Sequence, residues 1–431
     1  MNRIFRGFSG FCLIGMCLVP GVAFAETTGE VAALKIPAKE APPAPAASTQ
    51  GLLMDIMDWA GIGPILNKLG VKIYGYSDAG IMYDTTATRN GAGPTFLGFN
   101  YFKNTPMLNK ISLNVERTVD PSKKQFDIGF HLEGIWGTDA KFIHSNGIAD
   151  TQTGRYQMDP LQVYVDVAMP YLPIKIRAGK WIGLAGFEQF NANIGAFGDP
   201  ARAFYSYSYQ FLYAEPGTQT GVLGTYVLNP QWSFDLGITD GWNQSTRDAN
   251  HYADIVGRIS YTPNDKTAVI FVMSEGPEYP TGVGRGLPPG DHKDWWTAMD
   301  LVVTRKVTDK LSVGLGGDFV NAPHIPGLDK GAKQWGGVTG YGSYAFNPHV
   351  TLNSRGEWYI DAANGFSNGA STRANYYEFT LGPAIRPFAK NKYLSQILLR
   401  PEIRFDFSNQ AVFGSGEKIQ VSLSGDILYT F

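Results

Sequence analysis

The last fourteen residues of the chain, KIQVSLSGDILYTF, alternate between apolar and polar side chains. Ile419 and Leu423 would face one way, and Gln420 and Ser422 would face the other. A side-chain period of two is the signature of a β-strand, because successive Cβ atoms point to opposite faces of a sheet. The ends of soluble chains usually fray into polar tails. The pattern instead predicts a chain that stays in a sheet up to its final residue, Phe431.

Three other runs of 13 residues alternate in the same way, at 125–137, 349–361 and 396–408. A strand that crosses a bilayer at a tilt needs about 9–11 residues, whereas strands of soluble domains usually have about 5–6 residues. Alternation over this length favours strands that cross a membrane, with apolar side chains toward lipid and polar side chains toward a lumen.

The connections between the runs alternate in length. Short links carry the Pro, Asn and Asp residues that tight turns require. They are 120–124, 169–173, 229–231, 263–266, 307–310 and 347–349. Long links lie between them at 84–109, 138–159, 183–217, 240–253, 276–294, 321–335, 361–374 and 408–417. The predicted fold class is therefore all-β, a transmembrane antiparallel β-barrel with short periplasmic turns and long extracellular loops.

The same alternation predicts about 16 strands, within a range of about 14–18. Their expected first residues are Lys72, Lys110, Gln125, Leu161, Ile174, Thr218, Gln231, Asp254, Thr267, Trp295, Leu311, Gly336, Val350, Asn375, Ser395 and Lys418. An even count puts both chain ends on the periplasmic side, as single-chain barrels require. The run TFLGFNYFK at 95–103 is placed in the first long loop rather than in a strand.

Composition agrees with a large β protein. Charged residues make up 17% of the chain and aromatic residues 13%, and there are 51 glycines. Disordered chains combine low hydrophobicity with high net charge, so this profile excludes general disorder. A net charge of −2 offers no basic surface for nucleic acid, and we expect no nucleic-acid partner.

The first 25 residues have the three regions of a secretory signal peptide. Arg3 and Arg6 form a basic start, an apolar stretch follows, and small residues end it at Ala25. We therefore expect residues 1–25 to be removed on export. The alternative is a retained membrane anchor, but Pro20 interrupts the apolar stretch, which is also too short to span a bilayer.

Both cysteines, Cys12 and Cys17, lie inside this signal. A lipoprotein acceptor at Cys17 is disfavoured, because Met16 precedes it where a small residue is required. The exported chain would then have no thiol, which excludes disulfides and thiolate metal sites.

Three segments follow the signal. Residues 26–50 are rich in Ala and Pro, which predicts a flexible, partly extended periplasmic linker. Residues 51–70 place apolar side chains at helical spacing until Gly61 and Pro64 interrupt them, which predicts a short amphipathic helical segment. This segment would either cap the periplasmic mouth or lie against the outside of the barrel or the membrane surface. The barrel itself is predicted over 71–431.

Three stretches resemble a known family. They are GLLMDIMDWAGIGPILNKLGVKIYGYSDAG (51–80), EPGTQTGVLGTYVLNPQWSFDLGITDGWNQ (215–244) and GDILYTF (425–431). Together they resemble the putative β-barrel porin-2 family of Gram-negative outer-membrane barrels, over roughly residues 51–431. The resemblance implies an outer-membrane porin and supplies neither a substrate nor site residues.

Charged side chains on the polar face of the strands are the candidate pore lining, because a barrel of about 16 strands is too wide for its side chains to fill. The candidates are Asp127, His131, Glu133, Asp166, Lys175, Arg177, Arg355, Glu357, Arg386, Arg400, Glu402, Arg404 and Asp406. Rings of charge tune the ion preference of a pore. The alternative is that these groups only pair with their neighbours. Because both signs occur, we expect passive diffusion of small hydrophilic solutes and ions with weak selectivity.

The longest loop, 183–217, is the third long loop, which in sixteen-strand porins often folds into the barrel as a constriction; this expectation is an analogy between folds. Its charged residues are the candidate constriction groups, namely Glu188, Asp199, Arg202 and Glu215. As an alternative, four tyrosines could present a greasy surface for a sugar: Tyr205, Tyr207, Tyr209 and Tyr213. The loop could also fold over the outer rim or contact another subunit.

No catalytic motif is present. The sequence contains no HExxH, G-x-S-x-G or Walker loop. Four histidines fall in separate long loops and make no local motif: His144, His251, His292 and His324. We therefore expect no enzymatic activity, no metal site and no cofactor. The alternatives to a porin are an outer-membrane enzyme, which would need an acid/base cluster above the rim, and a structural or adhesion barrel with an occluded lumen.

Aromatic residues indicate contact with a membrane. Seven tryptophans lie at or near predicted strand ends, where an interfacial belt is expected: Trp136, Trp181, Trp242, Trp295, Trp296, Trp335 and Trp358. By analogy with other outer-membrane barrels, Phe431 is the expected signal for the barrel-assembly machinery. Outer-membrane lipid and small hydrophilic solutes are the other expected partners. Trimers are common among sixteen-strand porins, so a homotrimer is also considered, although no residue marks a trimer face.

Overall fold

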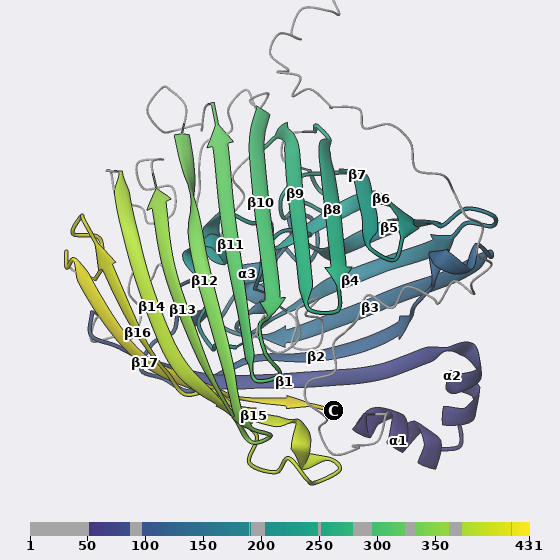
Figure 1. Ribbon diagram of the computed structural model, residues 1–431, viewed down its shortest axis with the longest axis horizontal. Helices are drawn as coiled ribbons and strands as arrows, with labels where there is room; N and C mark the ends of the chain where they lie inside the picture. The colour runs from purple at the N-terminus through teal and green to yellow at the C-terminus, as the bar shows by residue number, and fades with distance from the viewer. Residues whose placement is uncertain are drawn as a thin grey trace, which may run out of the picture. The chain divides into compact units, whose positions relative to one another are not determined.

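The computed structural model describes residues 51–86, 97–188, 190, 203–248, 251–278, 295–323, 333–361, 373–414 and 416–431. Within them, strands of one antiparallel sheet account for most of the chain (Figure 1). The strands are β1 (Val71–Asp84), β2 (Met107–Arg117), β3 (Asp127–Gly137), β4 (Gln157–Ala168), β5 (Ile174–Ile182), β6 (Thr218–Asn229), β7 (Trp232–Thr239), β8 (Asp254–Asn264), β9 (Thr267–Pro277), β10 (Trp295–Lys306), β11 (Leu311–Ala322), β12 (Lys333–Asn347), β13 (Val350–Asp361), β14 (Ala374–Ile385), β15 (Ile397–Leu399), β16 (Glu402–Ser408) and β17 (Ile419–Thr430).

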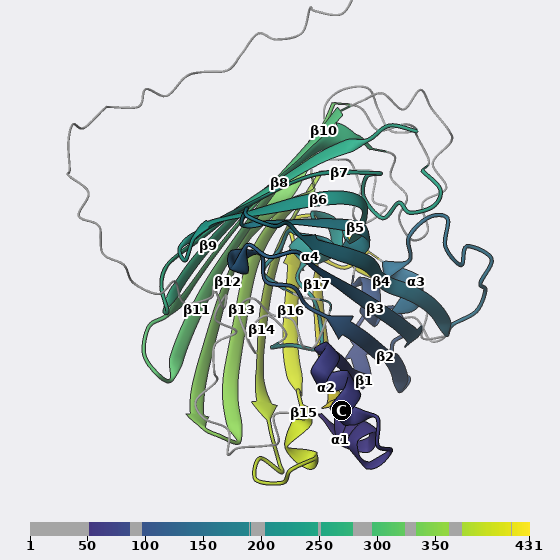
Figure 2. The same ribbon diagram turned by 90° about the vertical axis from the view of Figure 1, so that its right-hand side faces the viewer.

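The sheet closes on itself. From β1 to β14 each strand pairs antiparallel with the next one along the chain. The last strand, β17, returns to β1, with Thr430 opposite Tyr76 and Ser422 opposite Asp84. Figure 2 shows the strands wrapping around an interior. Closure removes the free edges at which an open sheet would pair with other chains.

Two short strands share one position in this barrel. Both β15 and β16 pair with β14 on one side and with β17 on the other. Arg400 and Pro401 separate them, and proline has no N–H with which to continue a ladder. Because β15 and β16 share one position, the 17 strands occupy 16 positions around the barrel. The predicted antiparallel barrel and its strand count are confirmed, and every predicted first residue lies within four residues of the observed one.

The two faces of the strands differ as a membrane barrel requires. On β17, Ile419 and Leu423 are 60% and 58% exposed, whereas Gln420 and Ser422 are buried. The same holds on β3, where Ile128, Leu132 and Trp136 are exposed and His131 and Glu133 between them are buried. Apolar side chains therefore face lipid, and polar side chains face the interior.

The tryptophans divide between these two faces. Trp136, Trp295 and Trp358 are exposed on the outside, as an interfacial belt requires. Trp181, Trp296 and Trp335 are instead fully or almost fully buried inside the barrel, and the half-buried Trp242 packs against Trp296. The predicted belt is therefore wrong for these four, because strand-end position alone does not tell which face a side chain is on.

Helices are few and short in the described residues. They are α1 (Leu52–Trp59), α2 (Gly63–Leu69), α3 (Ala140–Ile143) and α4 (Tyr209–Tyr213), with single 3-10 turns η1 (Gly98–Asn100), η2 (Pro121–Lys123) and η4 (Leu394–Gln396). None of the helices described is both long enough and apolar enough to span a membrane. The segment 97–103 forms η1 rather than a strand, so its predicted place in the first long loop is confirmed.

Helices α1 and α2 attach to the end of the barrel at which the chain terminates (Figure 1). The Ile73 N–H of β1 contacts the Met54 sulfur of α1 at 3.3 Å. The carbonyl oxygen of Leu69, in α2, accepts a hydrogen bond of 2.8 Å from the Arg117 side chain of β2. Trp59, at the end of α1, remains 89% exposed. The two helices thus pack on the rim and leave apolar side chains uncovered.

Candidate functional site

The long loop between β5 and β6 enters the interior of the barrel. Its described residues, 183–188, 190 and 203–217, are called the lumen loop below. The Gly186 N–H donates to Asp300 of β10 at 3.1 Å, and the Tyr205 hydroxyl contacts the Asn109 side chain of β2 at 3.0 Å. The Gln210 amide donates to a backbone carbonyl of β12 at 2.7 Å. Strands β2, β10 and β12 stand at separate positions around the barrel, so the loop crosses the lumen (Figure 2).

Two glutamates of the wall hold the backbone of the lumen loop. Glu402 of β16 accepts hydrogen bonds from the N–H groups of Tyr205 and Ser206, at 2.8 and 3.1 Å. Glu357 of β13 accepts from the N–H groups of Tyr209 and Gln210, at 2.7 and 2.8 Å. The second pair includes the first residue of α4, where N–H groups have no partner within the helix. Both carboxylates therefore anchor the loop rather than line an open channel.

Arg355 of β13 joins the wall to the loop by a buried ion pair. Its guanidinium donates to Glu188 at 2.7 Å and to the Ser206 carbonyl at 2.9 Å, both in the lumen loop. It also donates to Glu378 of the neighbouring strand β14 at 3.0 Å. Buried charges of this kind persist only when they are paired and hydrogen-bonded.

Arg404 and Asp406 of β16 make a second connection of this type. The Arg404 guanidinium donates to Asp406 at 2.8 Å and to the Tyr207 carbonyl of the lumen loop at 2.6 Å. The Tyr209 hydroxyl donates to the same Asp406 at 2.7 Å. All these side chains are buried. Arg355 and Arg404 are therefore both paired with carboxylates beneath the loop.

Arg400, between β15 and β16, belongs to a third charged group. Its guanidinium bonds the Asp426 carboxylate of β17 and lies 3.7 Å from Asp78 of β1. Nearby, the Lys110 ammonium pairs with Asp139 at 3.1 Å. Each of these side chains is buried.

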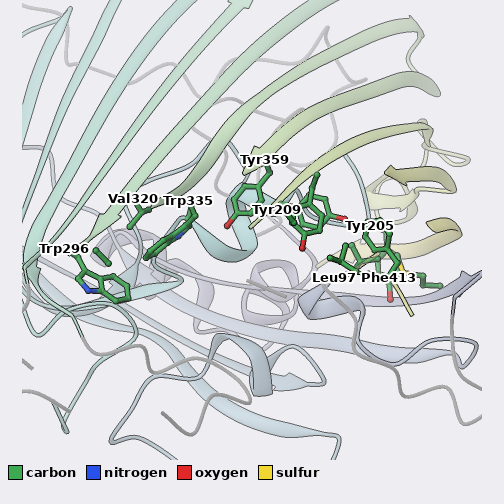
Figure 3. Packing of buried hydrophobic residues seen from close by; sticks show 14 residues of the cluster. Leu97, Tyr205, Tyr209, Trp296, Val320, Trp335, Tyr359 and Phe413 are labelled. Atoms are coloured by element: carbon green, nitrogen blue, oxygen red, sulfur yellow. The ribbon is translucent and has the colours of Figure 1, made fainter. Parts of the chain in front are cut away.

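Aromatic side chains fill the space between the loop and the wall. Figure 3 shows a band that runs from Trp296 through Trp335 and Tyr359 to Tyr209 and Tyr205. Tyr205 and Tyr209 are at most 3% exposed, and Tyr207 of a neighbouring cluster is 2% exposed. A sugar-binding surface is therefore wrong for these three tyrosines, because they pack as core residues and expose no face. Tyr213, the fourth, is half-buried and packs against the same band.

The wall formed by β4, β5, β7 and β8 is less covered. The side chains of Lys175, Arg177 and Arg258 are 19%, 17% and 29% exposed; they are called the basic wall below. Arg177 donates to Asp166 at 2.8 Å, and Lys175 lies 3.3 Å from the same carboxylate. Arg258 pairs with Asp235 at 2.6 Å. These charges are paired but remain within reach of solvent.

The candidates on β3 enter a mostly neutral network. Glu133 accepts hydrogen bonds from Ser112 at 2.7 Å and from Gln162 at 2.8 Å. The His131 ring bonds the Asn114 side chain at 2.8 Å. Asp127, near the periplasmic turn, pairs with Arg117 at 2.7 Å.

Four other candidates lie elsewhere. Arg386 follows β14 in the connection to β15, where its carbonyl contacts the His349 ring at 2.9 Å; it is therefore at a turn rather than on the wall. Asp199 and Arg202 lie outside the described residues. Glu215, at the end of the lumen loop, lies beside two aspartates of β10 and β11.

The sequence candidates did not include several charged residues of the interior, among them Asp78, Lys110, Asp235, Arg258, Asp300, Asp318, Glu378 and Asp426. The signal was present, because each stands in a strand whose side chains alternate between the two faces. The alternation was harder to recognise where the run was short or rich in glycine. Which side chains pair across neighbouring strands depends on the register of the strands, and the register cannot be read from a single sequence.

His144, in the loop between β3 and β4, lies between two aspartates. One ring nitrogen lies 2.9 Å from Asp150 and the other lies 3.4 Å from Asp159. Its hydrogen bond to Asp159 raises the pKa of His144, against the opposing effect of partial burial. Both nitrogens are occupied, so the ring has none left for proton transfer to a substrate. His292 and His324 lie outside the described residues.

Comparison with solved structures shows the same fold in outer-membrane porins. An anion-selective porin from Comamonas acidovorans has 13% identity and a TM-score of 0.52, covering 84% of this chain and 99% of that one. Salmonella typhi OmpF, solved with daunomycin, has 12% identity and a TM-score of 0.52, covering 85% and 99%. Pseudomonas putida OprB, in a high-pH structure, has 13% identity and a TM-score of 0.51, covering 87% and 97%. At these identities the likeness shows the fold alone.

A comparison with curated protein sequences found no significant match. The family model described as "Putative beta-barrel porin-2, OmpL-like" matches residues 70–431, which is the barrel from just before β1 to the last residue. The closed sixteen-position sheet, the lipid-facing apolar side chains and this match agree, and the chain belongs to the putative β-barrel porin-2, OmpL-like family of outer-membrane porins.

Proposed function

We propose that solutes diffuse passively through this porin between the lumen loop and the basic wall. The supporting observation is the difference between the two sides of the interior. Arg355 and Arg404 are buried and neutralised beneath the loop, whereas Lys175, Arg177 and Arg258 keep part of their surface exposed. Small hydrophilic molecules and ions would pass along that exposed side, because it is polar and wettable.

Selectivity would be weak and would favour anions. The basic wall has three bases, and Asp166 and Asp235 neutralise two of them. Glu116 on β2 faces the interior near the periplasmic end and adds one acid, since Tyr74 contacts its carboxylate at 3.2 Å. A small surplus of bases in the middle of the passage, with one acid beyond it, would give the pore a modest preference for anions.

The proposal also covers export, assembly and the segments that precede the barrel. Residues 1–25 would direct export, residues 26–50 would form a periplasmic linker, and the barrel-assembly machinery would recognise Phe431. The exposed apolar residues of α1 and α2 support contact of the helical segment with the periplasmic membrane surface. A homotrimer remains the expected assembly by analogy with other porins of this fold.

Planar-bilayer recording of the purified, folded barrel tests the proposal. We expect ion conductance without a gating ligand and a small reversal potential of anion-preferring sign in a KCl gradient. A folded, inserted barrel that conducts no ions would overturn the proposal and favour the occluded structural or adhesion barrel. Liposome swelling with uncharged sugars of increasing size would then measure the passage itself.

A further inference from the structure

Three carboxylates meet where the lumen loop returns to the wall. Asp300 of β10 and Asp318 of β11 are direct cross-strand neighbours. Glu215 approaches them from the loop, and one oxygen of each residue lies within 4.8 Å of the others. Asp300 and Asp318 are 4% and 8% exposed, so this is an interior site rather than an acidic surface.

These charges lack the ion pairing that several other interior carboxylates have. Asp426 pairs with Arg400, and Glu378 pairs with Arg355. Among the described residues, by contrast, neither Asp300, Asp318 nor Glu215 forms an ion pair with a lysine, arginine or histidine. Like charges directly opposite each other on neighbouring strands destabilise a sheet, and burial makes an uncompensated charge more costly.

A neutral side chain beside the carboxylates also lacks a partner. Gln219 of β6 lines the same small cavity as Asp300 and Asp318. It is 1% exposed, and neither its amide oxygen nor its amide nitrogen has a hydrogen-bond partner. One oxygen of Asp300 and one of Asp318 are unpartnered as well. Buried polar groups are nearly always satisfied, so unpartnered groups around one cavity point to a missing ligand.

We propose that Glu215, Asp300 and Asp318 bind a calcium ion, with the Gln219 amide oxygen as a further ligand. All four groups offer the hard oxygen atoms that Ca²⁺ prefers. Two oxygens on opposite sides of Ca²⁺ lie up to about 5 Å apart, because each bond is about 2.3–2.6 Å long, whereas Mg²⁺ at about 2.0–2.1 Å draws them closer. Oxygens within 4.8 Å of one another are compatible with one shared Ca²⁺.

The backbone around Glu215 leaves room for its carboxylate beside the two aspartates. Gly186 lies directly against this carboxylate in a left-handed conformation, with φ of 97°, and a Cβ there would come within 1.9 Å of a Glu215 oxygen. Only glycine leaves room for the carboxylate in this position.

Bound Ca²⁺ would tie the lumen loop to the wall. Glu215 belongs to the loop, whereas Asp300 and Asp318 belong to strands, so one ion would bridge the two parts. The bridge would lie on β10 and β11, whereas Glu357, Glu402, Arg355 and Arg404 anchor the loop to β13 and β16. This inference goes beyond the diffusion pathway, and it does not depend on whether the barrel conducts.

Binding can be measured directly on the folded barrel after removal of metal with EDTA. Tb³⁺ is a luminescent substitute for Ca²⁺, and Trp242, which lines the same cavity, would sensitise its emission. We expect Tb³⁺ emission that Ca²⁺ displaces, and thermal stability that rises with added Ca²⁺. Asp318→Asn and Glu215→Gln should weaken Ca²⁺ at least tenfold and remove the thermal shift.

Asp235→Asn is the matched control, because Asp235 is also a buried interior aspartate but pairs with Arg258. It should keep Tb³⁺ emission and Ca²⁺ affinity. Without calcium, Asp318→Asn should be at least as heat-stable as the unmodified chain, because it removes one of three repelling charges. A folded barrel with no Tb³⁺ or Ca²⁺ binding, or an Asp318→Asn variant with unchanged Ca²⁺ affinity, would overturn the proposal.

Discussion

Arg355 of the barrel wall and Glu188 of the lumen loop form an ion pair of 2.7 Å inside the barrel, where both side chains are buried. They lie 167 residues apart in the sequence. The pair belongs to a set of contacts in which wall charges bind the loop rather than face water. These contacts fix the position of the lumen loop and would in this way set the width of the proposed passage.

Replacing Arg355 with alanine should release the lumen loop. The change leaves Glu188 and Glu378 buried without their cation, and breaking a buried pair from one side costs about 3–5 kcal/mol. We expect a lower unfolding free energy in denaturant titration of the detergent-folded barrel, and larger, noisier single-channel currents. Arg305→Ala is the control, because Arg305 is an exposed residue of β10. Unchanged stability and conductance in the Arg355 variant would contradict the anchoring role.

Removing two of the three bases of the basic wall should reduce anion preference, with some loss of stability because Asp166 loses both of its cations. A unit charge about 4 Å from an ion in water is worth about 1 kcal/mol, and salt screens it further. The double change Lys175→Ala and Arg177→Ala should therefore lower the Cl⁻/K⁺ permeability ratio about two- to fivefold. Reversal potentials in a KCl gradient measure this ratio. If the ratio stays constant while conductance persists, ions pass elsewhere in the lumen.

The sequence predicted the barrel because strand period and loop length are local properties. The run that contains Arg404 and Asp406 showed by itself which side chains face inward. The contact of Arg404 with the Tyr207 carbonyl could not be predicted, because it joins residues 197 apart through the path of the loop. The break at Pro401 was likewise visible as a proline, but its effect, two strands in one position, depends on register with β14 and β17.

The outer loop between β3 and β4 should loosen as pH rises. The pKa of His144 is raised in the folded chain, so protonated His144 stabilises the loop. This stabilisation is fully present below the pKa of about 6.5 that histidine has in the unfolded chain. It is lost as pH rises through the higher pKa of His144 in the folded chain. Hydrogen exchange of 138–156 should be faster at high pH, after correction for intrinsic rates. His144→Gln should remove the difference, and a pH response that survives this change would assign it to other groups.

Phe431 should matter more for assembly than for conduction. Its N–H donates to the Gly75 carbonyl of β1 at 2.8 Å, and the Gly75 N–H donates back to the Phe431 carbonyl at 2.9 Å, so the last residue continues the seam that closes the barrel. Its ring lies over Gly75, where a Cβ would come within 2.5 Å of the ring. Phe431→Ala keeps both backbone hydrogen bonds and removes only the ring.

Two folding assays separate closure from recognition in this variant. If the ring acts only by packing, Phe431→Ala should lower the folded yield equally in detergent and in cells. If the assembly machinery reads the terminal aromatic, the yield in cells should fall further, while conductance per inserted channel stays unchanged. Phe405→Ala, which removes an exposed aromatic of the neighbouring strand β16, is the control and should assemble normally. Equal losses in both assays would refute a recognition role, because detergent folding contains no machinery to read the residue.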